Sequence, residues 1–194
     1  MGLYDAYLAA RLRHSAAALP ETVAVVLTER DLLDGGYATL EDLLGWAVEF
    51  GAERVVVYVS VLDSEAVPRL RAGLEGVSTP RPMAVRGPED DERADAPIQV
   101  SIGLGGKHEF ATAVRQLAEA VDAGDLDPEE IQEADIEDHL VFPVAPDIVV
   151  KTGAERLSDF MIWQSVYSEL YFTDVNWQHA RRRDYQDRQR RFGR

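Results

Sequence analysis

Two unbroken apolar runs, separated by one amphipathic segment, constrain the fold of this 194-residue chain more than any other feature. The runs Thr22–Leu27 and Arg54–Ser60 are rich in valine, a composition typical of strands buried on both faces of a sheet. Between them, Thr39 is the expected helix cap and Gly51 the expected stop. The intervening apolar stripe at helical spacing consists of Leu40, Leu43, Leu44 and Ala47. The pattern predicts a parallel β-α-β unit.

The remaining chain alternates between the same two patterns. Further strands are predicted at Ile98–Ile102, Ile148–Val150 and Tyr171–Phe172, and further helices at 3–12, 114–124, 127–134, 160–170 and 178–191. Residues 80–97 are rich in Pro, Asp, Glu and Arg and are expected to form a mobile loop. No repeat or linker divides the chain. We therefore expect a single α/β domain over residues 1–194, with a mainly parallel central sheet flanked by helices and a helical C-terminal tail at 178–194.

The net charge and the composition exclude several classes of binding partner and site. The net charge of −15 makes nucleic acid a poor partner, because phosphate binding needs a basic surface. The absence of cysteine excludes disulfides and thiolate metal sites, and no apolar run approaches the roughly 20 residues that span a bilayer. The N-terminus lacks a signal-peptide core, so a cytoplasmic protein is expected. The many acids, with only Lys107 and Lys151 as lysines, favour a halophilic source over the alternative of a GC-rich genome.

The end of the fourth predicted strand is the first candidate site, because ligands of open parallel sheets bind outside the carboxyl ends of the strands. Lys151 and Arg156 supply positive charge there, Thr152 and Ser158 supply hydroxyls, and Gly153 permits close backbone approach. These residues predict a phosphate or diphosphate cradle. An exposed polar turn with one ion pair explains the same residues, and composition leaves both interpretations open.

Two other strand ends carry weaker signals. The stretch Gly103–Lys107 places glycines before a lysine, but it lacks the spacing of a Walker loop, and a tight turn into a helix is favoured. After the first strand, Glu29 or Asp31 could bind a metal, although helix capping or solvation is the favoured role. Neither the histidines nor the serines form a recognisable catalytic or metal-binding pattern.

A family resemblance is carried by the C-terminal third. Residues Asp147–Gln164 resemble the pattern D-L-x-I-R-T-x-G-E-x-R-x-S-(N/D)-F-L-L-W-Q of the cis-prenyltransferases, the undecaprenyl diphosphate synthase family, and Tyr167–Trp177 continues the match. Upstream, Ile98–Lys107 resembles the family's strand that ends in N-Y-G-G-R. The ending Arg191–Gly193 resembles the family's terminal R-x-G. The resemblance covers nearly the whole chain in order.

The resemblance implies a prenyl transfer reaction. Members of the family condense isopentenyl diphosphate onto an allylic diphosphate with Mg²⁺ and build long cis-polyprenyl chains. Carried over by position, Arg156 and Ser158 would hold the diphosphate of isopentenyl diphosphate, and Lys151 stands where the family has arginine. Glu169 matches the family's C-terminal magnesium carboxylate.

Departures from the family pattern cluster on the allylic substrate. The aspartate of the D-G-N-x-R motif, which holds Mg²⁺, aligns with Thr28. The S-x-E-N-W stretch is replaced by Ser60–Asp63, and the chain is much shorter between Leu62 and Pro97, where family members build the product tunnel. The resemblance therefore assigns no catalytic residue to this chain.

Three functions follow from the resemblance. In the first, the chain resembles the accessory subunits of heteromeric cis-prenyltransferases, such as the eukaryotic Nogo-B receptor, and Arg191 and Gly193 reach the active site of a homologous catalytic subunit. In the second, it is an active divergent prenyltransferase, as a dimer with itself, in which Glu29 or Asp31 replaces the lost aspartate. In the third, it is an isoprenoid diphosphate-binding protein. Isopentenyl diphosphate is the expected ligand in each, and peripheral membrane association stays open.

Overall fold

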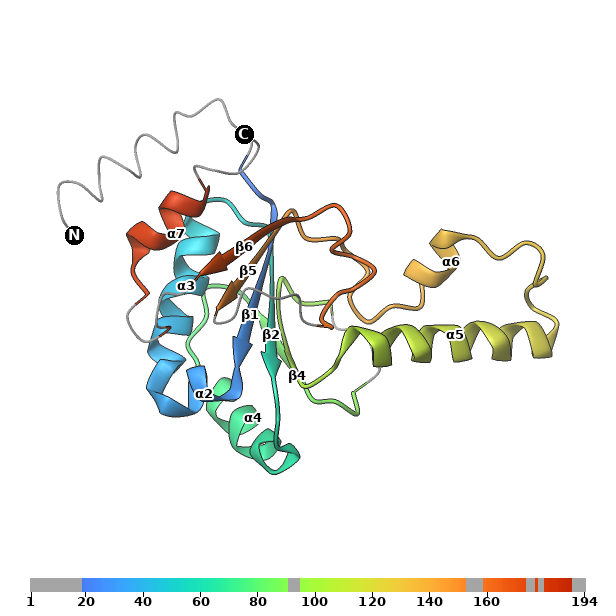
Figure 1. Cartoon of the computed structure of the whole chain (residues 1–194), viewed down its shortest axis with the longest axis horizontal. Helices are drawn as coiled ribbons and strands as arrows, with labels where there is room; N and C mark the ends of the chain where they lie inside the picture. The colour runs from blue at the N-terminus through green and yellow to red at the C-terminus, as the bar shows by residue number, and fades with distance from the viewer. Residues whose placement is uncertain (1–18, 91–94, 153–158, 174–176, 178–179, 190–194) are drawn as a thin grey trace.

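The computed structural model describes residues 19–90, 95–152, 159–173, 177 and 180–189. Within these ranges the chain forms one sheet of six strands, all paired in parallel, in the order β3-β4-β2-β1-β5-β6 (Figure 1). The strands are β1 (Thr22–Thr28), β2 (Arg54–Ser60), β3 (Met83–Arg86), β4 (Ile98–Ile102), β5 (Ile148–Thr152) and β6 (Glu169–Thr173). The predicted α/β class with a parallel central sheet is confirmed.

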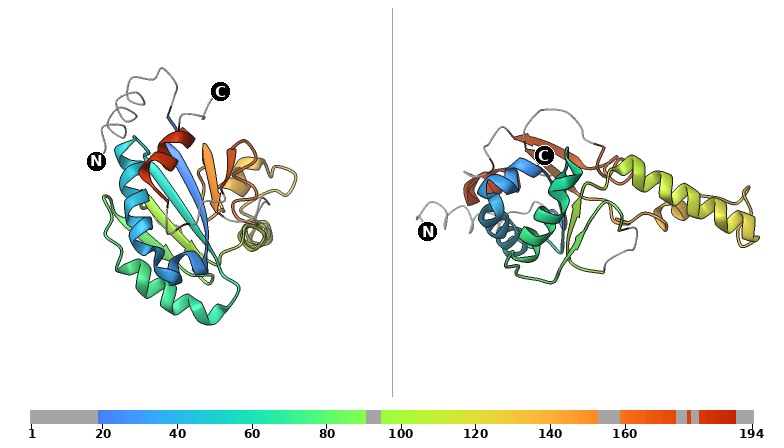
Figure 2. Two further views of the ribbon diagram at one scale, coloured as in Figure 1. Left: turned by 60° about the vertical axis from the view of Figure 1, so that its left-hand side comes forward. Right: turned by 90° about the horizontal axis from the view of Figure 1, so that it is seen from below.

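Helices flank this sheet. One face is covered by α3 (Tyr37–Glu49), α4 (Val67–Glu75) and α7 (Arg182–Gln189), which bury apolar side chains against it (Figure 2). On the other side, α5 (Gly106–Ala123) starts near the sheet and extends away from it as an arm on which the short α6 (Glu133–Glu137) packs (Figure 1). Short turns follow β1 and β2, namely α2 (Glu29–Asp31), a π-helical turn at 32–36 and a 3-10 turn at 64–66. None of the described helices is both long and apolar enough to span a bilayer.

Alternation along the strands gives the sheet two buried faces. Val23, Val25 and Leu27 of β1 belong to the cluster that packs against α3 and α4, whereas Ala24 and Val26 belong to a second cluster on the opposite face. Paired residues of parallel strands point to the same side, so the register defines one row of side chains across the second face. That row consists of Arg86, Ser101, Tyr58, Val26, Lys151 and Phe172. It lies toward the carboxyl ends of the strands.

Two predicted elements are wrong. Residues 80–97 are not only a loop, because they contain β3, a four-residue edge strand. Its signal is weak because three of its four residues are only partly buried, so the segment lacks an unbroken apolar run. The predicted helix at 160–170 is replaced by turns that lead into β6. Met161 has a φ of 49°, in the left-handed region, which interrupts any helix there.

Other boundaries move by a few residues. The helix expected to be capped by Thr39 begins at Tyr37 after Gly36, and Thr28 instead caps α2. The predicted helix at 127–134 is a turn followed by α6, and the tail helix is confirmed only for 182–189. The predicted close of α5 near Gly124 is confirmed, since Gly124 has a φ of 79° at the C-cap. The helix predicted at 3–12 lies outside the described residues.

Candidate functional site

The carboxyl end of β1 is closed by a set of hydrogen bonds around Asp31. One carboxylate oxygen of Asp31, Oδ2, accepts the backbone N–H of Thr28 at 2.7 Å and the Thr28 hydroxyl at 2.8 Å. The Thr152 hydroxyl at the end of β5 lies 3.2 Å from the same oxygen. Thr28 in turn accepts the N–H of Asp31, which completes a capping box. Asp31 therefore joins the ends of two neighbouring strands.

Glu29 likewise accepts backbone hydrogen bonds, on the side of β1 that faces β2. Its Oε2 accepts the backbone N–H of Leu62 at 3.0 Å and lies 3.4 Å from that of Asp63. The two carboxylates that could have replaced the family's aspartate thus both hold the backbone. Among the described residues, no three histidine or acidic side chains cluster as metal ligands. Each of the two acids is already engaged as a hydrogen-bond acceptor through one oxygen, so a Mg²⁺ ion here would share these carboxylates with the backbone.

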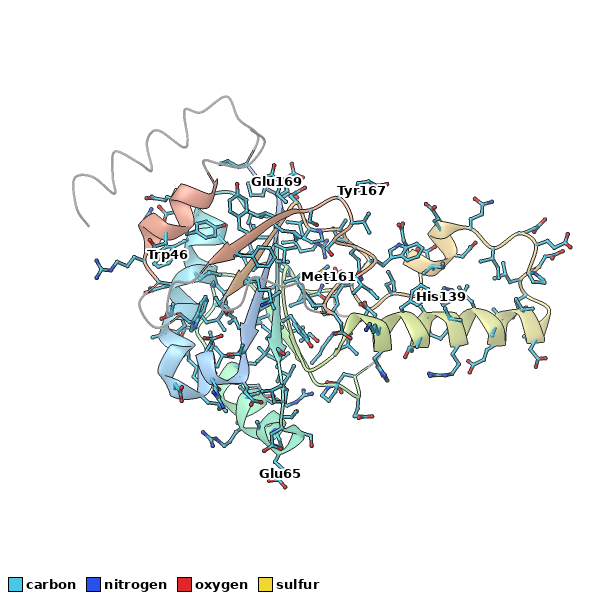
Figure 3. All side chains as sticks on the ribbon, in the orientation of Figure 1. Trp46, Glu65, His139, Met161, Tyr167 and Glu169 are labelled. Atoms are coloured by element: carbon cyan, nitrogen blue, oxygen red, sulfur yellow. The ribbon has the colours of Figure 1, made fainter. Side chains whose placement is uncertain are left out.

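Glu169 lies at the opposite end of the sheet. It is the first residue of β6 and pairs with Ile148, the first residue of β5, whereas Thr173 pairs with Thr152 at the carboxyl end. The two ends of β6 are four residue steps apart, which is about 13 Å at roughly 3.3 Å per residue. Figure 3 shows Glu169 at this far end. Within one chain the structure does not bring Glu169 together with Thr28.

A pocket of about 500 Å³ lies on the second face of the sheet, over β1, β5 and β6. Its polar lining comes from Lys107, Lys151, Asp159 and Ser165. Its apolar lining consists of Val26, Val149, Phe160, Ile162, Val166, Leu170, Tyr171 and Phe172. The only two lysines of the chain therefore meet in one pocket, which we call the lysine pocket.

The two lysines come from different elements. Lys151 is the penultimate residue of β5, and its side chain shares the second face with Phe172. Lys107 is the second residue of α5. Two lysines and a serine in an otherwise mostly apolar lining suit a ligand that has an anionic head and a short hydrocarbon body. Asp159 offsets part of the positive charge.

The wall formed by residues 159–166 is held tightly against α5. The N–H of Gly106 donates to the backbone carbonyl of Asp159, and the ring of Phe160 stacks on Tyr58 with centroids 4.5 Å apart. Met161 beside it is fully buried in its left-handed conformation. Burial raises the pKa of Tyr58 above its ordinary 10.0, and the Asp159 carboxylate raises it further, so the stacked phenol is neutral at physiological pH.

The other predicted site residues lie in different places. Lys151 lines the pocket, whereas Thr28 lies at the end of β1 and is not among the residues that line this pocket. Arg156, Ser158, Arg191 and Gly193 lie outside the described residues. Lys107, for which an ordinary turn was favoured, also lines the pocket. The rarity of lysine in this chain is the signal that could have linked it to Lys151.

Comparisons with known proteins point to one family. A family model described as "Putative undecaprenyl diphosphate synthase" matches residues 84–193. The tritrans,polycis-undecaprenyl-diphosphate synthase (geranylgeranyl-diphosphate specific) of Methanopyrus kandleri is 33% identical over 202 residues, which cover 82% of this chain and 74% of that enzyme. The enzyme with the same description from Methanocaldococcus jannaschii is 46% identical over 109 residues, which span 50% of this chain but only 39% of that relative.

Solved structures share the fold at lower identity. Lavandulyl diphosphate synthase from Lavandula x intermedia, in complex with dimethylallyl diphosphate, superposes with a TM-score of 0.72 at 20% identity and covers 90% of this chain and 95% of that one. A "probable undecaprenyl diphosphate synthase" from Campylobacter jejuni gives a TM-score of 0.68 at 19% identity, with coverage of 91% and 96%. At these identities the structures establish the fold alone.

Proposed function

Because this chain belongs to the undecaprenyl diphosphate synthase family, we propose that it acts in polyprenyl diphosphate synthesis as the non-catalytic subunit of a heteromeric synthase. In this role it binds isopentenyl diphosphate and a homologous catalytic subunit. The partner carries the aspartate that this chain has lost, and it supplies the site for the allylic diphosphate.

The observation that carries the proposal is which side chains stand at the carboxyl end of β1 and which hydrogen bonds they make. Thr28 stands at the position of the family's magnesium aspartate, and a hydroxyl is a poor ligand for a hard divalent cation. The neighbouring carboxylates of Asp31 and Glu29 already accept hydrogen bonds that fix the ends of β1 and β5 and the turn after β2. Asp31 and Glu29 each accept these hydrogen bonds on one oxygen, so a metal bound to either carboxylate would share it with the backbone N–H groups.

The lysine pocket supports retention of a diphosphate ligand. Lys107 and Lys151 would bind the diphosphate as two point charges, and the apolar lining over β5 and β6 would contact the five-carbon group. Ser165 would add one hydroxyl hydrogen bond. A chain that has this pocket but lacks the family's magnesium aspartate at Thr28 would suit a subunit that binds one substrate and presents it to a catalytic partner.

The face beside the pocket supports an association with a homologous subunit. Tyr167 is 99% exposed and Val166 67% exposed, and they adjoin the partly exposed Leu170 and Phe172 of β6. Strand β6 is the edge of the sheet in the part of the chain that the structure describes. An exposed apolar patch on an edge strand is unfavourable in isolation and typical of an interface. A homologous subunit would cover this patch and close the pocket.

Co-expression with a D-G-N-x-R-bearing homologue from the same genome tests the proposal. The measurement is Mg²⁺-dependent incorporation of labelled isopentenyl diphosphate by each chain alone and by the pair. The proposal expects an inert chain alone, a copurifying pair and a faster pair. A variant of the chain with Tyr167→Asp should lose the acceleration, whereas Glu119→Gln on the exposed side of α5 should keep it.

Three results would contradict the proposal. Incorporation by the chain alone would make it an active divergent prenyltransferase. Binding of isopentenyl diphosphate without any association would make it a diphosphate-binding protein. If the chain neither binds isopentenyl diphosphate nor associates with the homologue, it does not act in this pathway.

A further inference from the structure

A buried carboxylate outside the lysine pocket is hydrogen-bonded to the segment that forms one of its walls. Glu109, in the first turn of α5, is only 3% exposed. One of its oxygens accepts the backbone N–H of Phe142 at 2.9 Å, and the side-chain amide of Gln164 lies 3.3 Å from both oxygens. The same Gln164 amide donates to the Phe142 carbonyl at 2.8 Å. Three segments that are distant in the sequence therefore meet at one carboxylate.

Two of these three segments contribute residues to the pocket. Gln164 lies between Ile162 and Ser165, both of which line the pocket, and Lys107 precedes Glu109 by two residues on the same helix. A change at Glu109 would therefore act on both sides of the pocket, on the lysine of α5 and on the hydroxyl of the opposing wall. Glu109 itself does not line the pocket.

The carboxylate is costly for the fold. Burial raises the pKa of Glu109 above its ordinary value of 4.5, against the opposing effects of its hydrogen bonds to Phe142 and Gln164 and of the charge of Arg86. Arg86 of β3 is itself buried and lies on the same face of the sheet. The raised pKa shows that these partners offset only part of the desolvation cost of the buried carboxylate.

We propose that Glu109 is a positioning residue, which acts through Gln164 to hold the 160–166 wall of the lysine pocket at the correct distance from Lys107. A charged acceptor binds the Gln164 amide and the Phe142 N–H more strongly than a neutral one. Its advantage is therefore a more rigid pocket, gained at the expense of stability. This inference rests on the proposed binding of isopentenyl diphosphate.

Calorimetry with isopentenyl diphosphate on the full chain tests it. Glu109→Gln should weaken binding by the folded protein about tenfold, because its amide N–H group would face the N–H donors of Gln164. Glu119→Gln, on the exposed surface of the same helix, is the matched control and should leave the affinity unchanged. A fold-stabilising role alone would lower the thermal midpoint of Glu109→Gln but leave the affinity of the folded protein unchanged, and that result would overturn the inference.

A double-mutant cycle and hydrogen exchange complete the test. If Glu109 acts through Gln164, Gln164→Met should weaken binding as Glu109→Gln does, and the double variant should lose little more. Additive losses would overturn the inference. In the absence of ligand, Glu109→Gln should speed amide exchange in residues 160–166. Should the wild type bind no isopentenyl diphosphate, the proposed function fails, and unchanged exchange in this variant would separately refute the positioning role.

Discussion

Gly106 is the position where a single methyl group should disturb the site most. A Cβ there would overlap the carbonyl oxygen of Asp159 and lie 3.0 Å from the backbone nitrogen of Ile162 and 3.1 Å from that of Met161. All three atoms belong to the backbone, so no side-chain rotation can relieve the contact. Gly106→Ala should therefore push the 159–162 segment away from α5 and break the hydrogen bond from Gly106 to Asp159.

The expected cost can be estimated. Overpacking against backbone costs roughly 1–3 kcal/mol, and the lost hydrogen bond about 1 kcal/mol. The helix preference for alanine returns at most about 1 kcal/mol. A net loss of about 2 kcal/mol corresponds to a fall of roughly 4–8 °C in the thermal midpoint for a chain of this size. Affinity for isopentenyl diphosphate should fall as well, because the displaced segment carries the pocket wall.

Gly45 provides the matched control for this substitution. It lies inside α3, and a Cβ there would meet nothing within 4 Å. Gly45→Ala should raise the unfolding free energy by roughly 0.5–1 kcal/mol through helix propensity alone. Thermal unfolding of both variants followed by circular dichroism gives the comparison. A Gly106→Ala protein as stable as Gly45→Ala, with unchanged ligand affinity, would refute the close packing of α5 against the pocket wall.

Three further predictions concern single side chains. Lys107→Ala and Lys151→Ala should each weaken isopentenyl diphosphate binding roughly 10- to 100-fold by calorimetry, since a charged hydrogen bond contributes about 1.5–3 kcal/mol, whereas Arg115→Ala on exposed α5 should have no effect. Asp31→Asn keeps an acceptor for the cap, so it should lower the unfolding free energy by less than about 1 kcal/mol and leave the rate of the reconstituted pair unchanged; an abolished rate would instead make Asp31 a metal ligand. Because the pKa of Glu109 is raised, the native state binds its proton more readily than the unfolded chain does, so the unfolding free energy should fall as the pH rises from about 4.5 through that raised pKa. Urea titrations against pH should lose this component in Glu109→Gln, and an identical pH profile would contradict it.

The strands of the sheet could be predicted where the local pattern of apolar side chains determines them. β1 and β2 are continuous apolar runs because both faces of the sheet are covered, so their strands follow from composition. β3 was missed because a short edge strand needs no such run. The helix predicted at 160–170 failed because contacts with Gly106 and Glu109 hold the segment in turns, and these contacts are invisible in a local pattern.

The candidate site was predictable only in part. The pattern around Lys151 indicated an anion site because charge, hydroxyls and glycine occur together in the sequence. The convergence of Lys107 with Lys151 depends on how α5 packs beside β5, which no spacing rule reports. The sequence gives no signal for Glu109, since nothing in its local pattern reveals the hydrogen bonds to Gln164 and Phe142.

The most direct test of the central claim is the rate of isopentenyl diphosphate incorporation by purified chain, by its D-G-N-x-R-bearing homologue, and by the two mixed at equal concentration with Mg²⁺. The account predicts no incorporation by the chain alone and a mixed rate well above that of the homologue. Restoring the aspartate with Thr28→Asp should not activate the isolated chain, because the stretch between Leu62 and Pro97, where family members build the product tunnel, stays short. Incorporation by the unmodified chain alone, or a mixed rate equal to that of the homologue, would contradict the account.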